Sequence, residues 1–167
     1  MIISDENKVF DVYFNGSMSN DSYGIQRNII VNQIEKSNFT HSELIKRVST
    51  KDYFINLKKS KVCISPFGYG EICYRDFEII KSGSLLCKPN MNHLLTYPNF
   101  YVPFITYVPF EWNIEDFNYN ISKILKNESD YYRIKNNAQK LLKEFYTDEG
   151  KVKFVNHVLK SIDIYEE

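Results

Sequence analysis

Residues 61–89 read KVCISPFGYGEICYRDFEIIKSGSLLCKP, and this stretch decides the fold. The β-rich run over 61–65 predicts a strand, which a glycine-containing loop brings to an end. The next apolar spacing predicts a helix over 71–81, with Gly83 as the residue just beyond its end. A second apolar strand follows over 84–88. A strand, a helix and a strand in this order form a βαβ unit, which requires parallel strands.

Alternating strands and helices are also predicted on both sides of this unit. An alternating run over 9–14 predicts a further strand, and the Pro-broken aromatic segment 90–112 predicts irregular structure with one short strand at 106–108. Helices are predicted over 23–36 and 51–60, from Asn113 as N-cap with Ile114 buried in its first turn, from Ser129, and from Thr147 or Asp148. The sequence therefore predicts an α/β fold: a three-layer Rossmann-like domain with a mostly parallel sheet and C-terminal helices.

Two of these helices carry specific expectations about their buried sides. In the helix over 51–60, we expect Tyr53, Phe54 and Leu57 to face inward. In the last helix, the i, i+3/4, i+7 spacing predicts five buried residues: Phe154, Val155, Val158, Leu159 and Ile162.

Length and composition place the chain in a broad class. The 167 residues suit one domain, so we predict a single domain over 1–167 whose terminal helix covers 147–167. Twenty-one Lys and Arg balance twenty-one Asp and Glu, which argues against general binding of nucleic acid. We find no apolar run of membrane-spanning length and no signal peptide, and we expect a cytoplasmic protein with reduced cysteines. The three histidines lie far apart in sequence, so no metal site is predicted.

The helix after the glycine loop carries the candidate chemistry. Gly68 and Gly70 would let the backbone approach an anion, and the N-terminus of the next helix favours negative charge. Glu71, Arg75 and Glu78 stand at i, i+4 and i+7, which predicts one polar stripe along this helix. The Arg75 fork suits a diphosphate, and Glu78 suits the vicinal hydroxyls of a ribose.

Two alternatives remain open at this stage. The same three residues fit a solvated helix face with internal ion pairs equally well. Asp76 either falls inside the apolar side of a helix that begins at Glu71, or is a first-turn acid of a helix that begins near Tyr74.

Residues 65–71, together with 73–78 and Gly83, resemble the donor-binding half of GT-B glycosyltransferases, closest to the exostosin-like and the viral or bacterial sugar-transferase groups. The resemblance covers residues 9 to about 145 and includes the loop 14–17. It implies a nucleotide sugar as donor substrate, no cofactor and no metal. It also implies donor contacts by Gly16, Ser17, Gly68, Tyr69, Gly70, Glu71, Arg75 and Glu78. The family signature has seven residues between its two glutamates, whereas Glu71 and Glu78 have six between them, so Glu78 is the firmer match.

Three functions are compatible with the sequence. The chain is expected to be a donor-binding domain that acts with a second glycosyltransferase domain or as a homodimer, through an aromatic surface over 97–112. The alternatives are a non-catalytic module that binds a nucleotide or a partner, and a small phosphate-binding α/β domain of another kind. A complete GT-B enzyme would need about 350 residues, counted as two domains. We therefore name no catalytic base.

Overall fold

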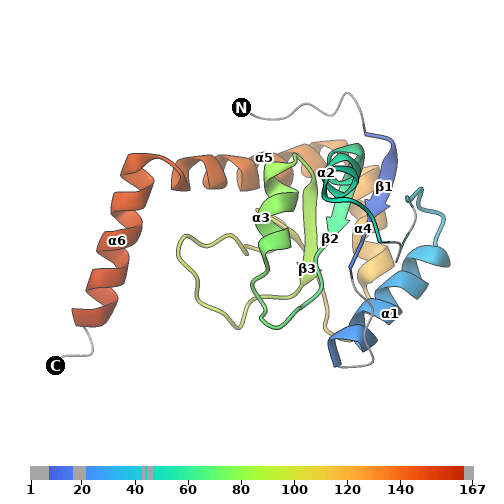
Figure 1. Ribbon diagram of the computed structural model, residues 1–167, viewed down its shortest axis with the longest axis horizontal. Coiled ribbons are helices and arrows are strands. Elements are labelled where there is room, and N and C mark those ends of the chain that lie inside the picture. The colour runs from blue at the N-terminus through green and yellow to red at the C-terminus, as the bar shows by residue number, and fades with distance from the viewer. Residues whose placement is uncertain (1–7, 17–21, 43, 45–46, 164–167) are drawn as a thin grey trace.

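A sheet of four parallel strands lies at the centre of the protein in the computed structural model, which describes residues 8–16, 22–42, 44 and 47–163 (Figure 1). The strands are adjacent in chain order, β1-β2-β3-β4, and every neighbouring pair is parallel. The predicted α/β class is therefore confirmed. The elements are β1 (Phe10–Tyr13), α1 (Ser22–Glu35), α2 (Thr50–Lys59), β2 (Ser60–Ile64), α3 (Tyr74–Lys81), β3 (Leu85–Pro89), β4 (Val108–Phe110), α4 (Phe117–Lys126), α5 (Glu128–Phe145) and α6 (Asp148–Asp163).

Helices cover both faces of the sheet, because alternate strand residues point to opposite sides. Val12, Val62 and Leu85 pack with α1 and α4 in one core. Tyr13 and Cys63 pack with α2 and α3 in the other core, to which the segment after β3 also contributes. Side chains of α5 enter both cores, which gives the three-layer arrangement that the sequence predicts.

The strands run down the page in Figure 1, so their carboxyl ends share the lower edge. The loops that follow β1, β2 and β3 begin at this edge, and α3 starts from it. Ligands of open parallel sheets bind beyond the carboxyl ends of the strands. A ligand site is therefore expected at this carboxyl edge of the sheet.

Helix α3 begins at Tyr74, not at Glu71 as the apolar spacing predicts. The Asp76 carboxylate accepts a hydrogen bond from the backbone N–H of Cys73, at 3.1 Å, and so caps the first turn. Of the two alternatives for Asp76, the first-turn acid is the one observed. The prediction for Gly83 is confirmed, since it has φ 77° just after the Ser82 C-cap.

Replacement of Gly83 by alanine is expected to lower the free energy of unfolding by about 1 kcal/mol, because a Cβ is disfavoured at positive φ. Chemical denaturation would measure this loss. Gly70→Ala is the matched control, since φ is not left-handed there and the nearest heavy atom to a new Cβ lies 3.8 Å away. An equal loss in both variants would contradict this explanation.

The position of β4 and the start of α4 both differ from the prediction. The strand lies over Val108–Phe110 because the Thr106 hydroxyl donates to the carbonyl of Phe100, at 2.7 Å, which keeps Thr106 in a turn. The helix begins at Phe117 with Asp116 as N-cap, not at Asn113. Ile114 is buried as predicted but has φ 64°, a conformation that cannot belong to a right-handed helix.

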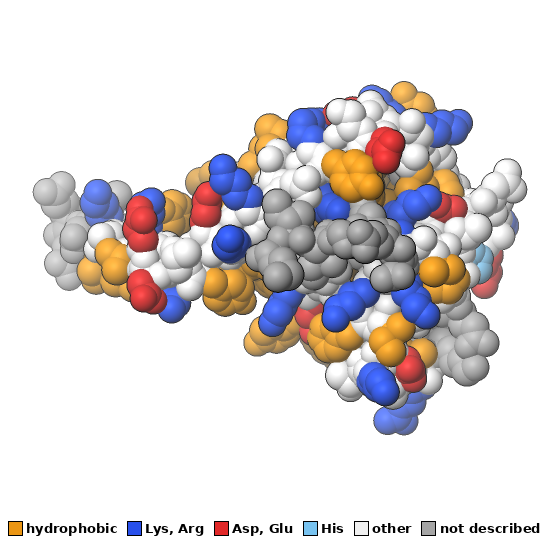
Figure 2. Space-filling model, turned by 90° about the horizontal axis from the view of Figure 1, so that it is seen from above, with side chains coloured by type: hydrophobic (Ala, Val, Ile, Leu, Met, Phe, Trp, Pro, Cys, Tyr) orange, Lys and Arg blue, Asp and Glu red, His pale blue; other side chains and the backbone are white. Residues whose placement is uncertain are grey.

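The prediction that α6 buries its apolar side is wrong. Figure 1 shows α6 descending from the end of α5, and Figure 2 shows it as an arm that leaves the body with hydrophobic and charged side chains on its surface. Phe154 packs on Phe145 with ring centroids 5.6 Å apart, and His157 stacks on Tyr97 at 4.1 Å. All five residues predicted to be buried are at least 36% exposed: Phe154, Val155, Val158, Leu159 and Ile162. Helical periodicity gives the apolar side of a helix but not what covers it.

Candidate functional site

A cavity of about 290 Å³ opens at the carboxyl end of β1, between α2 and α3. Its position at this edge of a parallel sheet is where ligands of such folds bind. The cavity brings together three residues singled out in the sequence, Gly16 from the loop after β1 and Arg75 and Glu78 from α3. The complete lining is Asn15, Gly16, Val48, Thr50, Tyr53, Phe54, Arg75 and Glu78.

Arg75 extends from the first turn of α3 toward the end of β1. Its Cζ lies 5.5 Å from the centre of the Phe14 ring, and its Nη2 lies 3.2 Å from where a Cβ on Gly16 would be. Its Nε is buried and, within the part of the chain that the structure describes, has no hydrogen-bond partner. Arg75 is one of the residues that line the cavity, and a planar guanidinium is suited to an anion with several acceptor oxygens.

Glu78 lies one turn further along α3 and is held by a tyrosine from α2. The Tyr53 hydroxyl donates to Oε2 of Glu78 at 2.8 Å. Burial and this hydrogen bond raise the pKa of Tyr53 well above its usual range, so the hydroxyl keeps its proton. Among the described residues, no ion pair joins Arg75 to Glu78. Glu78 raises the pKa of Tyr53 and Arg75 lowers it, so the three side chains lie close together on the cavity wall.

Glu71 does not belong to this group, because it precedes α3 instead of lying on it. Its Oε1 is 2.7 Å from Nε2 of His93, which comes from the loop after β3. The predicted stripe of Glu71, Arg75 and Glu78 on one helix is therefore wrong at its first member. The predicted ion pairs within that stripe are also not formed between these described residues.

The glycine loop after β2 lies next to the cavity lining but does not form it. The N–H of Phe67 donates to Oε1 of Gln26 at 3.1 Å, and Nη2 of Arg27 donates to the Phe67 carbonyl at 3.3 Å. These two side chains of α1 hold the loop in place. Gly68 and Gly70 both have room for a Cβ and no left-handed φ, so packing within the described chain does not require glycine there. Tyr69 is 99% exposed.

Two other predicted ligand contacts are Ser17 and the backbone N–H groups at the N-terminus of the helix that carries Arg75. Ser17 lies outside the described residues. The Cys73 N–H at the start of α3 is taken by Asp76, so this group is not left for a ligand as the sequence analysis expects of the helix N-terminus. Of the N–H groups at the start of α3, those of Cys73 and Asp76 are therefore paired within the protein.

Gly16→Ala is expected to weaken the binding of an anion in this cavity about tenfold, because a small displacement of a binding group is costly. The new Cβ would lie 3.1 Å from Cζ of Phe14 and 3.2 Å from Nη2 of Arg75, so the guanidinium must shift. The guanidinium end can shift cheaply, but the Phe14 ring is buried in the core and yields less easily, so we also expect the melting temperature to fall. Calorimetry and thermal unfolding measure the two effects. Unchanged affinity would show that this position of Arg75 is not the binding position.

Sequence reasoning missed the wall that α2 contributes to the cavity. Tyr53 and Phe54 are predicted as core residues, but both are only half-buried, and Leu57 alone of the three is fully buried. The Ser49 side chain accepts from the Asp52 N–H and starts α2 at this point. The signal available was two adjacent aromatic residues, four and five positions after a helix N-cap, and this by itself does not distinguish a core from a cavity wall.

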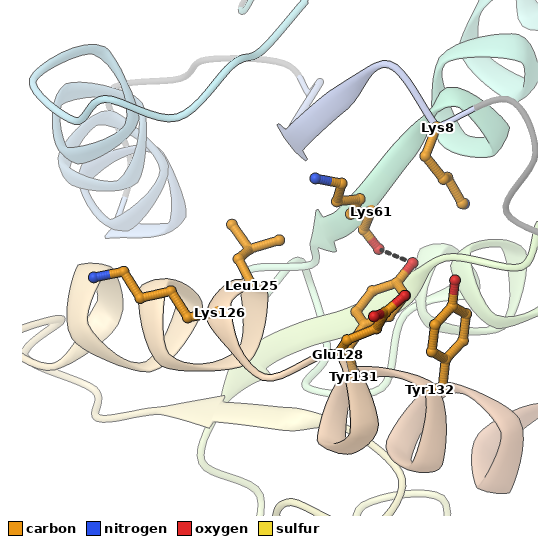
Figure 3. A pocket seen from close by; sticks show the side chains of 7 residues that line it. All are labelled: Lys8, Lys61, Leu125, Lys126, Glu128, Tyr131 and Tyr132. Carbon is orange, nitrogen blue, oxygen red and sulfur yellow. Dashed lines mark hydrogen bonds between the residues drawn. The ribbon is translucent and has the colours of Figure 1, made fainter.

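A larger cavity of about 460 Å³ lies near the other edge of the sheet (Figure 3). Three lysines line it, but Lys61 pairs with Asp11 at 2.9 Å, and Nζ of Lys8 donates to Ser60 and Ser84. In Figure 3 the amines of Lys61 and Lys126 point away from the two tyrosine hydroxyls. Glu128 adds a carboxylate to the same lining. This cavity is larger but is poorly suited to an anion.

The described residues hold neither a metal-binding cluster nor a membrane-spanning helix. No three His, Cys, Asp or Glu side chains within them come together in a way that could hold a metal ion. None of the helices described is both long and apolar enough to cross a bilayer.

Neither protein-family models nor curated proteins give a match to this chain.

Proposed function

We propose that the chain binds a nucleotide sugar and is the donor-binding domain of a glycosyltransferase of the GT-B type. The observation that carries this proposal is the cavity at the carboxyl end of β1, where Arg75 and Glu78 face the same space beside Gly16. A guanidinium and a carboxylate on successive turns of one helix fit a ligand that presents first phosphates and then hydroxyls.

The order of the groups along α3 supports a nucleoside diphosphate. Arg75 would donate to the phosphate oxygens, because its planar fork matches two of them at once. Glu78 lies three residues further on, about 4.5 Å along the helix axis. One oxygen of Glu78 accepts from Tyr53, and the other can accept from a ribose hydroxyl.

The space around Glu78 is large enough to continue beyond the ribose. A neighbouring hollow of about 600 Å³ shares Phe54 and Glu78 with the cavity and is further lined by Lys58, Lys81 and Ser82. Small-ligand sites usually occupy about 300–1,000 Å³. The cavity alone is at the low end of that range, and the two spaces together suit a nucleotide.

Isothermal titration calorimetry with UDP, GDP, UDP-glucose and GDP-mannose tests this proposal. We expect at least one nucleotide to bind with a dissociation constant between about 1 μM and 1 mM, a common range for enzyme substrates. Free uridine and guanosine should bind far more weakly, because they lack the diphosphate. The absence of binding by all four nucleotides would contradict the proposal.

Sugar transfer requires more than this site, and the proposal includes a second glycosyltransferase domain or a second copy of the chain. We assign no metal to the donor site, since Arg75 would supply the positive charge for the diphosphate. Light scattering gives the oligomeric state. A transfer assay with labelled donor then shows whether the chain acts unaided or, as we expect, needs its partner.

A further inference from the structure

Asp76 is a buried carboxylate directly beside the proposed phosphate ligand Arg75. Its side chain is fully buried, and four donors converge on it. The Ser65 hydroxyl donates to Oδ1. Oδ2 accepts from the Tyr101 hydroxyl at 2.7 Å and the Cys73 N–H at 3.1 Å, and Nζ of Lys88 is 3.3 Å away.

Lys88 is equally inaccessible and comes from β3. Its side chain is 0% exposed, and its Nζ lies 3.4 Å from the Ser65 carbonyl and 5.2 Å from the centre of the Phe67 ring. The ion pair therefore joins the end of β2, the first turn of α3, β3 and the segment that carries Tyr101. Phe67, from the glycine loop, covers it.

A buried ion pair adds little net stability, because the cost of removing two charges from water roughly offsets their attraction. What such a pair can supply is a fixed geometry in a place where several segments meet. Here Asp76 lies in the first turn of the helix that carries Arg75, and Lys88 contacts the Phe67 ring of the loop over 66–73. The pair therefore links that helix to that loop.

We propose that the Asp76–Lys88 ion pair positions Arg75 in the donor site by fixing the first turn of α3 against the loop 66–73 that leads into it. The inference rests on the proposed function for its ligand. Asp76 fixes the Cys73 N–H, which ends the loop, and directly follows Arg75 in the chain. Lys88 fixes Asp76 and, through the Phe67 ring, the start of the loop.

Lys88→Met removes the charge and keeps much of the side-chain length. The matched control is Lys135→Met, because Lys135 is also buried, at 2% exposed, but lies on α5 beside the Tyr132 ring. Both variants should lower the melting temperature. We expect only Lys88→Met to raise the UDP or GDP dissociation constant of the folded protein, by at least tenfold.

Hydrogen exchange tests the same inference without any ligand. The amides of Phe67, Gly68 and Cys73 should exchange at least tenfold faster in Lys88→Met, and at the wild-type rate in Lys135→Met. If the wild-type protein binds no nucleotide, the proposed function fails, while these exchange rates still decide whether the ion pair positions the loop. Wild-type exchange of the loop in Lys88→Met would overturn the inference.

A double variant separates positioning from stability. Asp76→Asn combined with Lys88→Met leaves no buried charge, so its melting temperature should recover relative to Lys88→Met. Loop exchange and nucleotide affinity should remain altered. Recovery of all three would overturn the positioning role.

Tyr101→Phe provides the test if Lys88→Met does not fold. It removes one donor to Asp76 without leaving a charge unpaired, and we expect faster exchange of the Cys73 amide. Wild-type exchange of that amide would count against the inference.

Discussion

Replacement of Arg75 by alanine is expected to weaken nucleoside diphosphate binding about a hundredfold or more. A hydrogen bond to a charged group contributes about 1.5–3 kcal/mol, and a guanidinium can make two such bonds to a diphosphate. Each 1.4 kcal/mol changes a dissociation constant about tenfold. Calorimetry with the best-binding nucleotide of the wild-type protein measures the loss.

Two control variants define what Arg75 contributes. Arg75→Lys should recover only part of the affinity, because an ammonium supplies the charge without the planar fork. Arg133→Ala should bind as the wild type does, because Arg133 pairs with Asp130 on the exposed side of α5. Equal loss in Arg75→Ala and Arg133→Ala would indicate a general effect of net charge. Wild-type affinity in Arg75→Ala would show that Arg75 does not contact the nucleotide.

Asp76→Asn is expected to cause the largest loss of stability among the single substitutions considered. It leaves the Lys88 ammonium buried without a counter-ion, since that side chain is 0% exposed. Breaking a buried pair in this way costs about 3–5 kcal/mol, against a total stability of about 5–15 kcal/mol. For a chain of this size the melting temperature should fall by about 6–20 °C. Calorimetric or circular-dichroism melting measures it.

An exposed ion pair provides the matched control. Asp130 pairs with Arg133 at 2.7 Å, but both side chains are more than a third exposed. Such surface pairs contribute about 0–1 kcal/mol, so Asp130→Asn should leave the melting temperature nearly unchanged. Similar shifts in Asp76→Asn and Asp130→Asn would show that burial of the Asp76–Lys88 pair does not set its energy.

The fold could be predicted because its signals are local. Alternating strands and helices, a glycine loop and the end of α3 at Gly83 are all written in short stretches of sequence. The start of α3 was not predictable in the same way. Glu71 and Tyr74 are both compatible with the apolar spacing, and the contact between Asp76 and the Cys73 N–H decides between them.

Long-range packing explains what the sequence did not reveal about the site. Arg75 and Glu78 could be paired from their spacing, since one turn of helix joins them. Tyr53 lies 25 residues from Glu78 and reaches it only because α2 and α3 pack on the same face of the sheet. The pairing of Glu71 with His93 spans 22 residues and depends on the loop after β3. Similarly, the spacing of α6 gave its apolar side, but the path of the chain leaves that side exposed.

The most direct test of the account is a nitrogen–proton correlation spectrum recorded while UDP or GDP is added. We predict that the largest shifts occur at the amides of Asn15, Gly16, Thr50 and Arg75, around the cavity at the carboxyl end of β1. Shifts confined to the residues around Lys61 and Lys126 at the other cavity would contradict this account, as would a spectrum that no nucleotide changes.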